Sequence, residues 1–276
     1  MTGIGPQSGK VFFVGAGPGD PELLTMKAHA LLRWAGIVLH DDLVPASILS
    51  LAGPHAMIVN VGKRCGAKKI TQAEIHRLLI ASARRGMNVV RLKSGDPGIF
   101  GRLAEEIDSL EAAGIPAEVV PGVTAGVAAA ASLGVSLTDR RTSSRVVIVS
   151  GHHGDESAAE VDPDWARLAG EDASLLIYMP GKDYARLARE LLAAGFSADL
   201  PCLAVSKVST PEQSDLRTTL GEFQTAAPLE SPTVLLVGRV FARALKQRNW
   251  NSLIEIARLT VSQANWKELP ERRIES

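Results

Sequence analysis

Cysteine and net charge are both scarce in this sequence, and each absence narrows what the chain can do. Only Cys65 and Cys202 occur, far apart and without CxxC spacing. We therefore expect no disulfide framework and a reducing, cytoplasmic location. The 30 basic residues equal the 30 acidic ones, so net charge predicts no nucleic-acid partner and no membrane-surface partner.

Long hydrophobic runs are missing as well. No uncharged apolar stretch reaches the ~18 residues that a membrane span needs. The opening segment, MTGIGPQSGK, has no apolar run after a charged start, so we do not expect a signal peptide. The 276 residues are 46% hydrophobic and 22% charged, which is typical of a soluble globular protein, and their number favours two domains.

The first half of the chain alternates apolar runs with amphipathic segments. Thr71 and Glu74 have the spacing of a capping box, and Gly86 is placed to end the helix that they begin. Strands separated by helices of ordinary length predict an α/β unit with a mainly parallel sheet. We expect strands at 10–17, 37–41, 56–62, 88–96 and 117–122, and helices at 21–36, 71–86, 101–114 and 123–134.

The second half mixes strands and helices with fewer regular crossovers, which predicts a mixed sheet. We expect strands at 145–151, 173–181, 201–210 and 231–240, and a helix at 183–195. Polar residues and glycine interrupt the apolar pattern at 134–144, where we place the domain boundary. The predicted division is a flexible N-terminus (1–9), an N-terminal α/β domain (10–135), a C-terminal α/β domain (136–246) and a partly helical or disordered tail (247–276).

A glycine-rich turn, GAGPGD, joins the first strand to the first helix. It resembles a dinucleotide fingerprint, but Asp20 stands where the third glycine should be, and its charge would repel a pyrophosphate. Pro18 also removes one N–H donor from the turn. Two interpretations stay open, a purely structural turn and a turn that brings a ligand close to the backbone.

Six motifs, in this order and spacing, resemble the uroporphyrinogen-III C-methyltransferases within the wider tetrapyrrole (precorrin) methyltransferase family. They are VGAGPGDPELLTMKA, HDDLV, VGKR, RLKSGDPGIFGR, VVPGVTAGVAAAASLGVSLTDRR and SPTVLLVG, and they cover about residues 10–245. The fourth motif departs from the family pattern at two positions. Ser94 replaces its first glycine, and Gly98 replaces a bulky residue.

The resemblance implies a homodimer of chains with two α/β domains each and the active-site cleft between those domains. It implies that S-adenosylmethionine donates methyl groups to C2 and C7 of uroporphyrinogen III, giving precorrin-2, the branch point to sirohaem and cobalamin. A methyltransferase acting later in the corrin pathway is the nearest alternative, because cleft shape sets substrate choice. Two other classes of protein are further alternatives. Asp20 argues against an NAD-dependent oxidoreductase, and Asp41 and Lys63 argue against a donor-binding regulatory protein without catalysis.

The resemblance also assigns roles to residues. Asp41 and Lys63 match the family's proton acceptor and proton donor, while a helix cap at Asp41 and a carboxylate contact at Lys63 remain alternatives. In the donor site, a carboxylate such as Asp96 suits an ammonium group, glycines let backbone approach a ligand, and a helix N-terminus offers N–H groups to a carboxylate. The positions matching the donor site are Pro18, Ser94, Gly95, Asp96, Ile99, Thr124, Ala125, Met179, Val208 and Thr233.

Basic residues near strand ends are expected to bind the eight carboxylates of the substrate, because an arginine fork binds a carboxylate through two hydrogen bonds. For this role we select Arg64, Lys93, Arg102 and Arg140. His152 and His153 invite a metal interpretation, but adjacent residues at a strand end point apart, so we expect no metal.

Overall fold

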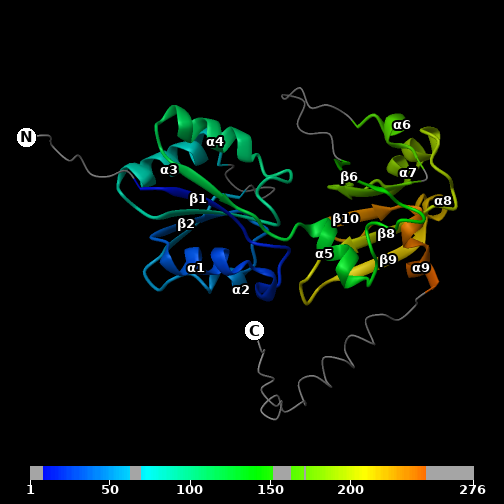
Figure 1. Cartoon of the computed structure of the whole chain (residues 1–276), viewed down its shortest axis with the longest axis horizontal. Coiled ribbons are helices and arrows are strands. Elements are labelled where there is room, and N and C mark those ends of the chain that lie inside the picture. The colour runs from blue at the N-terminus through cyan, green and yellow to red at the C-terminus, as the bar shows by residue number, and fades with distance from the viewer. Residues whose placement is uncertain (1–8, 63–69, 152–162, 171, 247–276) are drawn as a thin grey trace, which may run out of the picture.

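Two five-stranded sheets form the framework of the chain (Figure 1). The computed structural model describes residues 9–62, 70–151, 163–170 and 172–246. Lys63, Arg64, His152 and His153 lie outside these residues, as do the predicted tail at 247–276 and all but residue 9 of the predicted N-terminal segment. In Figure 1 the first sheet lies to the left, the second lies to the right, and α5 lies between them.

The first sheet is entirely parallel, as the alternating pattern predicts, with strand order β3-β2-β4-β1-β5. Its strands are β1 (Val11–Gly15), β2 (Ile37–His40), β3 (Met57–Asn60), β4 (Val89–Lys93) and β5 (Ala117–Val120). The central pair runs in register from Val11 opposite Val89 to Gly15 opposite Lys93. The carboxyl end of this pairing matters for the site, because β1 and β4 finish side by side there.

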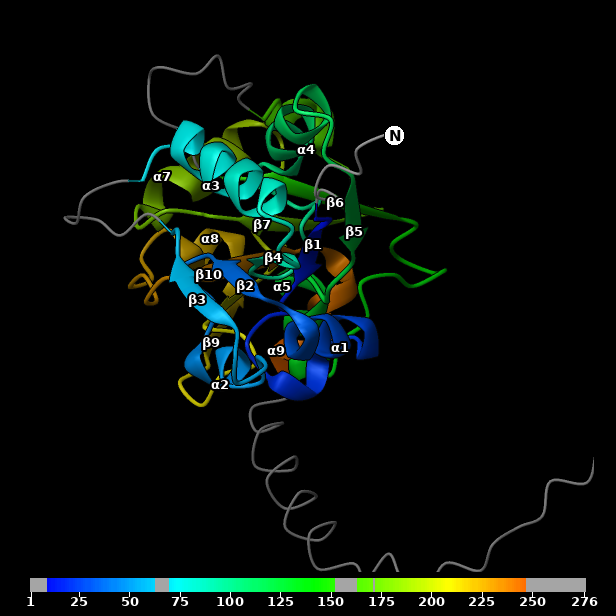
Figure 2. The same cartoon turned by 90° about the vertical axis from the view of Figure 1, so that its left-hand side faces the viewer.

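Helices cover both faces of the first sheet (Figures 1 and 2). One face packs against α1 (Met26–Trp34) and α2 (Ala46–Leu49). The other packs against α3 (Gln72–Arg84) and α4 (Leu103–Ala112). Successive residues of a strand point to opposite faces, so neighbours such as Phe12 and Phe13 enter different cores.

The second sheet is mixed, with order β6-β7-β10-β8-β9. The β6 and β7 strands pair in parallel, and the other pairs are antiparallel. Helices α6 (Trp165–Leu168), α7 (Tyr184–Ala193) and α8 (Leu220–Phe223) lie on one face. The strands are β6 (Arg145–Ser150), β7 (Ala173–Tyr178), β8 (Pro201–Ser206), β9 (Ser214–Thr219) and β10 (Thr233–Val237). The predicted combination of a parallel and a mixed sheet is confirmed.

Helix α5 (Ala125–Ser132) follows β5 in the chain but packs on the second sheet, beside η2 (Arg239–Phe241) and α9 (Ala242–Lys246). Small residues permit this close approach, since a Cβ added at Gly126 would lie 2.9 Å from Cδ1 of Leu176. The chain therefore crosses to the second sheet ahead of residue 135, although α5 was expected within the first domain.

Local signals explain where the helices of the first sheet begin. The capping box is confirmed, because Thr71 Oγ1 accepts from the Glu74 N–H and the Glu74 carboxylate accepts from the Thr71 N–H. The predicted helix 21–36 is instead two helices. Asp20 caps the short η1 (Pro21–Leu23), and Thr25 caps α1 by accepting from the Ala28 N–H. Across the described ranges, no helix is long and apolar enough to cross a membrane.

Candidate functional site

Five turns at the carboxyl ends of strands meet between the two sheets. They follow β1 (16–20), β4 (94–102), β5 (121–124), β7 (179–183) and β8 (207–210). Open α/β sheets bind ligands outside the carboxyl ends of their strands, so this meeting point is the candidate functional site. The five turns contain all ten positions that the resemblance matched to the donor site except Ala125 and Thr233, which begin α5 and β10.

The turns of the first sheet touch one another backbone to backbone. The Gly17 N–H donates to the Gly95 carbonyl at 3.1 Å, and the Gly95 N–H donates to the Gly17 carbonyl at 2.8 Å. A Cβ added at Gly122 would lie 2.3 Å from the Gly95 oxygen and 2.8 Å from Cα of Gly15. Side chains are excluded at this junction, which leaves backbone groups as its lining.

Asp96 ties two of these turns together. Its Oδ1 accepts from the Gly98 N–H at 2.8 Å, and its Oδ2 accepts from the Gly122 N–H at 3.0 Å. A carboxylate has about four acceptor sites, so two such bonds leave capacity for a ligand's ammonium group. The carboxylate predicted at this position from the resemblance therefore also has a structural role that the sequence did not indicate.

Tyr178 joins the second sheet to the beginning of α5. Its hydroxyl oxygen accepts from the Gly126 N–H at 2.6 Å and lies 2.6 Å from Oγ1 of Thr124. Burial raises the pKa of Tyr178, which keeps its proton available for Thr124. The Gly126 N–H is thus already satisfied within the chain and is not among the N–H groups that the beginning of α5 could offer to a ligand. The Tyr178 ring also lies 5.4 Å from the ring of Phe100.

Replacing Tyr178 by phenylalanine should lower the free energy of unfolding by about 1–3 kcal/mol, because the Gly126 N–H would lose its buried acceptor. Tyr184→Phe is the matched control. Its hydroxyl accepts from the Leu229 N–H at 3.2 Å and also bonds to the Thr233 side chain. Because the bond to Leu229 is longer than the 2.6 Å bond to Gly126, we expect a smaller loss. Urea unfolding of both variants measures the difference, and an equal loss would contradict the role given to Tyr178.

Strained backbone is concentrated in the same turns. Within the described ranges, the non-glycine residues with positive φ are Phe100, Arg102, Met179, Lys207 and Ser209, at +48° to +62°. Each such residue costs on the order of 1–3 kcal/mol, and such strain gathers at functional sites. All five follow β4, β7 or β8, which independently marks the place where the turns meet.

The first turn reaches the second sheet directly. A Cβ added at Gly19 would lie 2.7 Å from Cγ2 of Thr210 and 3.3 Å from the Val208 carbonyl. Val208 buries its own side chain in the core of the second sheet, which suits the expected main-chain role at that position. Asp20 fills the beginning of η1, where its Oδ1 accepts from the Glu22 N–H at 2.9 Å. That place is therefore not open to a pyrophosphate.

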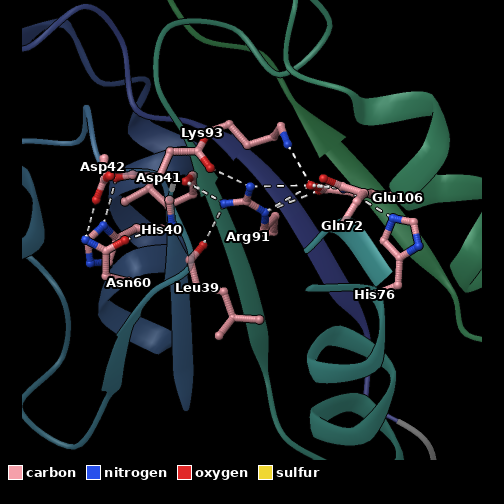
Figure 3. A network of polar contacts seen from close by, with 12 residues as sticks. Leu39, His40, Asp41, Asp42, Asn60, Gln72, His76, Arg91, Lys93 and Glu106 are labelled. Atoms are coloured by element: carbon pink, nitrogen blue, oxygen red, sulfur yellow. Dashed lines mark hydrogen bonds and ion pairs between the residues drawn. The ribbon is translucent and has the colours of Figure 1, made fainter. Parts of the chain in front are cut away.

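Asp41 stands at the end of β2 with its carboxylate partly open to solvent (Figure 3). Its side chain is 30% exposed, and its Oδ1 lies 2.5 Å from Nη2 of Arg91. Its backbone N–H donates to the Leu92 carbonyl at 3.2 Å. Among the described residues, no hydrogen bond has the Asp41 side chain capping a helix. A carboxylate held at a strand end and open to solvent is suited to proton transfer.

The remaining predicted residues occupy different environments. Met179 is 47% exposed. Ser94 and Ile99 are half-buried in the turn after β4, Pro18 is half-buried in the turn after β1, and Ala125 is half-buried at the beginning of α5. Thr233 begins β10, and its hydroxyl donates to the Glu230 carbonyl at 2.9 Å. Met179 thus offers apolar surface to solvent, whereas Gly17, Gly19 and Gly95 of the glycine turns are buried.

The predicted basic residues divide into buried and exposed ones. Lys93 is 2% exposed and donates to Glu106 at 3.0 Å, so it presents no charge at the surface, contrary to the expectation that it binds substrate. Arg102 is exposed and pairs with Glu105, and Arg140 is exposed beside the Arg141–Asp139 pair. The part of the chain that the structure describes contains no group of three His, Cys, Asp or Glu side chains able to hold a metal.

Comparison with known proteins agrees with this arrangement. The family model for tetrapyrrole (corrin/porphyrin) methylases matches residues 10–224. The uroporphyrinogen-III C-methyltransferase of Paracoccus denitrificans is 43% identical over 239 residues, covering 86% of this chain and 83% of that protein. The protein of the same name from Pseudomonas aeruginosa is 44% identical, covering 84% and 94%.

Solved structures are similar over most of the chain. Uroporphyrin-III C-methyltransferase from Thermus thermophilus, complexed with S-adenosylhomocysteine, has a TM-score of 0.73 at 38% identity, covering 85% of this chain and 94% of that one. A cobalt precorrin-4 methyltransferase has the same TM-score at 28% identity, covering 86% and 95%. The fold is thus common to enzymes named for different tetrapyrroles.

Proposed function

We propose that this chain, which belongs to the tetrapyrrole (corrin/porphyrin) methylase family, is an S-adenosylmethionine-dependent methyltransferase that acts on uroporphyrinogen III. The observation that carries the proposal is the meeting of five strand-end turns beside the open carboxylate of Asp41. The relatives' names, at 43% and 44% identity, support the choice of substrate.

The described residues fit the methyl donor. S-adenosylmethionine carries an ammonium group, a carboxylate and an aromatic adenine ring, and its sulfonium supplies an activated methyl group. Asp96 retains acceptor capacity for the ammonium beyond its bonds to Gly98 and Gly122. The side-chain-free junction at Gly95 lets a ligand approach the backbone. Exposed Met179 offers apolar surface for a ring. We propose that the ten donor-site positions named from the sequence hold this ligand.

The chain's contribution to the chemistry is positioning and proton transfer. A pyrrole carbon of the substrate forms a new bond to the methyl group, so the protein must hold both partners in line and close together. The methylated macrocycle then carries positive charge until a proton leaves. We propose that Asp41 accepts this proton, because its carboxylate is open to solvent at a strand end. Lys63, which lies outside the described residues, is proposed as the proton donor.

Substrate carboxylates require cations that reach them. Arg102 and Arg140 are exposed, and together with Arg64 we propose that they bind the propionate and acetate groups of the macrocycle through bidentate contacts. Arg102 pairs with Glu105 through two bonds of 2.7 Å, so it is held at the end of the turn that carries Asp96. Lys93 is removed from this group because it is buried.

The finer parts of the proposal concern product and assembly. We propose that two methyl groups are transferred, to C2 and C7, giving precorrin-2, and that the enzyme works as a cytoplasmic homodimer. A later precorrin methyltransferase is the second candidate, because the cobalt precorrin-4 enzyme has the same TM-score as the uroporphyrin enzyme. Higher identity to the uroporphyrin enzymes, 38% against 28%, favours the first.

An anaerobic turnover experiment tests the substrate. The purified chain is incubated with uroporphyrinogen III and S-adenosylmethionine labelled with ¹³C in its methyl group, and the product is analysed by mass spectrometry and NMR. We expect two labelled methyl groups, at C2 and C7, and none when S-adenosylhomocysteine replaces the donor. Donor binding without transfer would overturn uroporphyrinogen III as the substrate and favour a later precorrin.

A further inference from the structure

A buried charge cluster, consisting of Arg91, Lys93 and Glu106, lies behind Asp41 in the first sheet (Figure 3). The three side chains are 3%, 2% and 1% exposed. Removing charges from water costs several kcal/mol per ion, and apolar residues of similar volume are often as stable or more so. Stability alone therefore gives little reason for this cluster, and a role in the neighbouring site is a better one.

Arg91 is fixed through every nitrogen of its guanidinium group. Its Nε donates to Glu106 at 3.3 Å, and its Nη1 donates to the Leu39 and Leu92 carbonyls at 3.3 and 3.4 Å. Its Nη2 donates to Oδ1 of Asp41 at 2.5 Å. The planar guanidinium cannot turn without breaking several of these bonds. Asp41 is thus held by a group that is itself immobile.

Glu106 holds the cluster together from α4. Its Oε1 accepts from Lys93 at 3.0 Å and from Nε2 of Gln72 at 3.1 Å, while Oε2 faces Arg91. Two buried cations share this one buried carboxylate, and the second counter-charge is Asp41 at the solvent end. Burial and then the charge of Arg91 lower the pKa of Lys93, whereas Glu106 and Asp41 raise it. Asp41 is therefore part of the charge balance of the cluster.

The same cluster lies beneath the turn proposed to bind the donor. Lys93 is the last residue of β4, directly before that turn, and Glu106 lies in the first part of α4, directly after it. A Cβ added at Gly101 would lie 2.9 Å from Cε of Lys93, so the turn folds over the lysine side chain. One set of contacts therefore connects the donor turn to the proposed base.

We propose that Arg91 and Glu106 are positioning residues that fix the Asp41 carboxylate relative to the donor-binding turn 94–102. This inference rests on the proposed methyl transfer and on Asp41 as its proton acceptor. In this role Arg91 acts only through Asp41, and Glu106 acts through Arg91. Neither side chain touches substrate or donor, because both are buried.

A double-mutant cycle on the anaerobic methyl transfer tests the proposal. Arg91→Lys keeps the charge but loses the fork, and we expect kcat to fall about 30-fold, within the roughly 100-fold that a 1 Å misplacement of a reacting group costs. The Kd for S-adenosylhomocysteine should stay within about twofold, because Lys93 and Glu106 still support the turn. When Asp41 is already Asn, adding Arg91→Lys should lower kcat by less than about threefold, since groups that act as a unit are not additive.

Two further variants separate positioning from a general effect on the fold. Glu106→Gln keeps shape and one acceptor oxygen, and we expect a fall in kcat of about tenfold with the same non-additivity toward Asp41→Asn. Arg217→Lys is the matched control, a partly buried arginine that pairs with Asp215 at 2.7 Å on β9 of the second sheet. Its kcat should stay within about twofold of the unchanged protein.

The outcomes are distinct. Losses that multiply in both cycles, or an unchanged kcat in a variant that still binds S-adenosylhomocysteine, would overturn the positioning role. Loss of S-adenosylhomocysteine binding in both Arg91→Lys and Glu106→Gln would assign the cluster to folding alone and would also overturn it. Failure of the unchanged protein to methylate uroporphyrinogen III would instead refute the proposed function, and the inference would fall with it.

Discussion

Asp41→Asn should lower the rate of methyl transfer by about 10²- to 10⁴-fold, the usual contribution of a positioned proton-transfer group. The amide keeps the size of the side chain but cannot accept a proton from the methylated macrocycle. Donor affinity should not change, because Asp41 directly follows β2 and the donor-binding turns follow other strands. Single-turnover kinetics with uroporphyrinogen III, and calorimetric titration with S-adenosylhomocysteine, measure the two quantities separately.

The adjacent carboxylate supplies the control for this prediction. Asp42 bonds to Nδ2 of Asn60 at 2.7 Å instead of to Arg91, and Figure 3 shows it directed away from the buried charge cluster. Asp42→Asn should therefore retain transfer within about threefold, as is usual away from reacting groups. Equal losses in the two variants, or a full rate in Asp41→Asn, would contradict the role proposed for Asp41.

Gly122→Ala should have the largest effect on the donor site itself. Its new methyl group would lie 2.3 Å from the Gly95 oxygen, 2.8 Å from Cα of Gly15 and 3.0 Å from the carbonyl carbon of Gly15. All three are backbone atoms, so none of them can rotate away. Overpacking of this kind typically costs about 1–3 kcal/mol. The turns must separate, so S-adenosylhomocysteine should bind at least about tenfold more weakly, a change of 1.4 kcal/mol.

Gly36→Ala is the corresponding control. Gly36 precedes β2, and a Cβ added there would meet its nearest atoms at 3.7 Å, an ordinary contact distance. Its unfolding free energy should change by less than about 1 kcal/mol, and its donor affinity should be unchanged. If thermal unfolding and titration give the same values for Gly122→Ala and Gly36→Ala, the backbones of Gly15, Gly95 and Gly122 are not in close contact.

The parallel first sheet was predictable because its signals are local. Apolar runs of strand length alternate with amphipathic helices, and the Thr71–Glu74 capping box is a pattern of four adjacent residues. Strand β9, in contrast, was missed. Its residues Ser214–Thr219 are mostly polar and half-buried at the edge of the second sheet, so they show no clear alternation.

Tertiary packing decided what the sequence left open. The Ala-rich helix α5 is apolar on nearly every side, so its composition does not indicate which sheet it covers. The Tyr178 hydroxyl finds its partners on a segment far away in the chain. No local pattern predicts either contact.

Lys93 shows where a signal in the sequence was available. It shares strand parity with Val89 and Arg91, and that face of β4 is covered by α3 and α4. A period of two therefore places Lys93 in the interior, and the acidic run at 105–106 offers a partner. Strand parity, weighed before charge, would have assigned this lysine to a buried ion pair instead of to substrate binding.

The most direct test of the account is a crystal structure of the unchanged protein with S-adenosylhomocysteine. We predict that the ligand lies among the five strand-end turns, with its amino group at Asp96, its backbone contacts at Gly95 and the turn 121–124, and its sulfur facing Asp41. A ligand found elsewhere, or one whose sulfur faces away from Asp41, would contradict the proposed site and the role of that carboxylate.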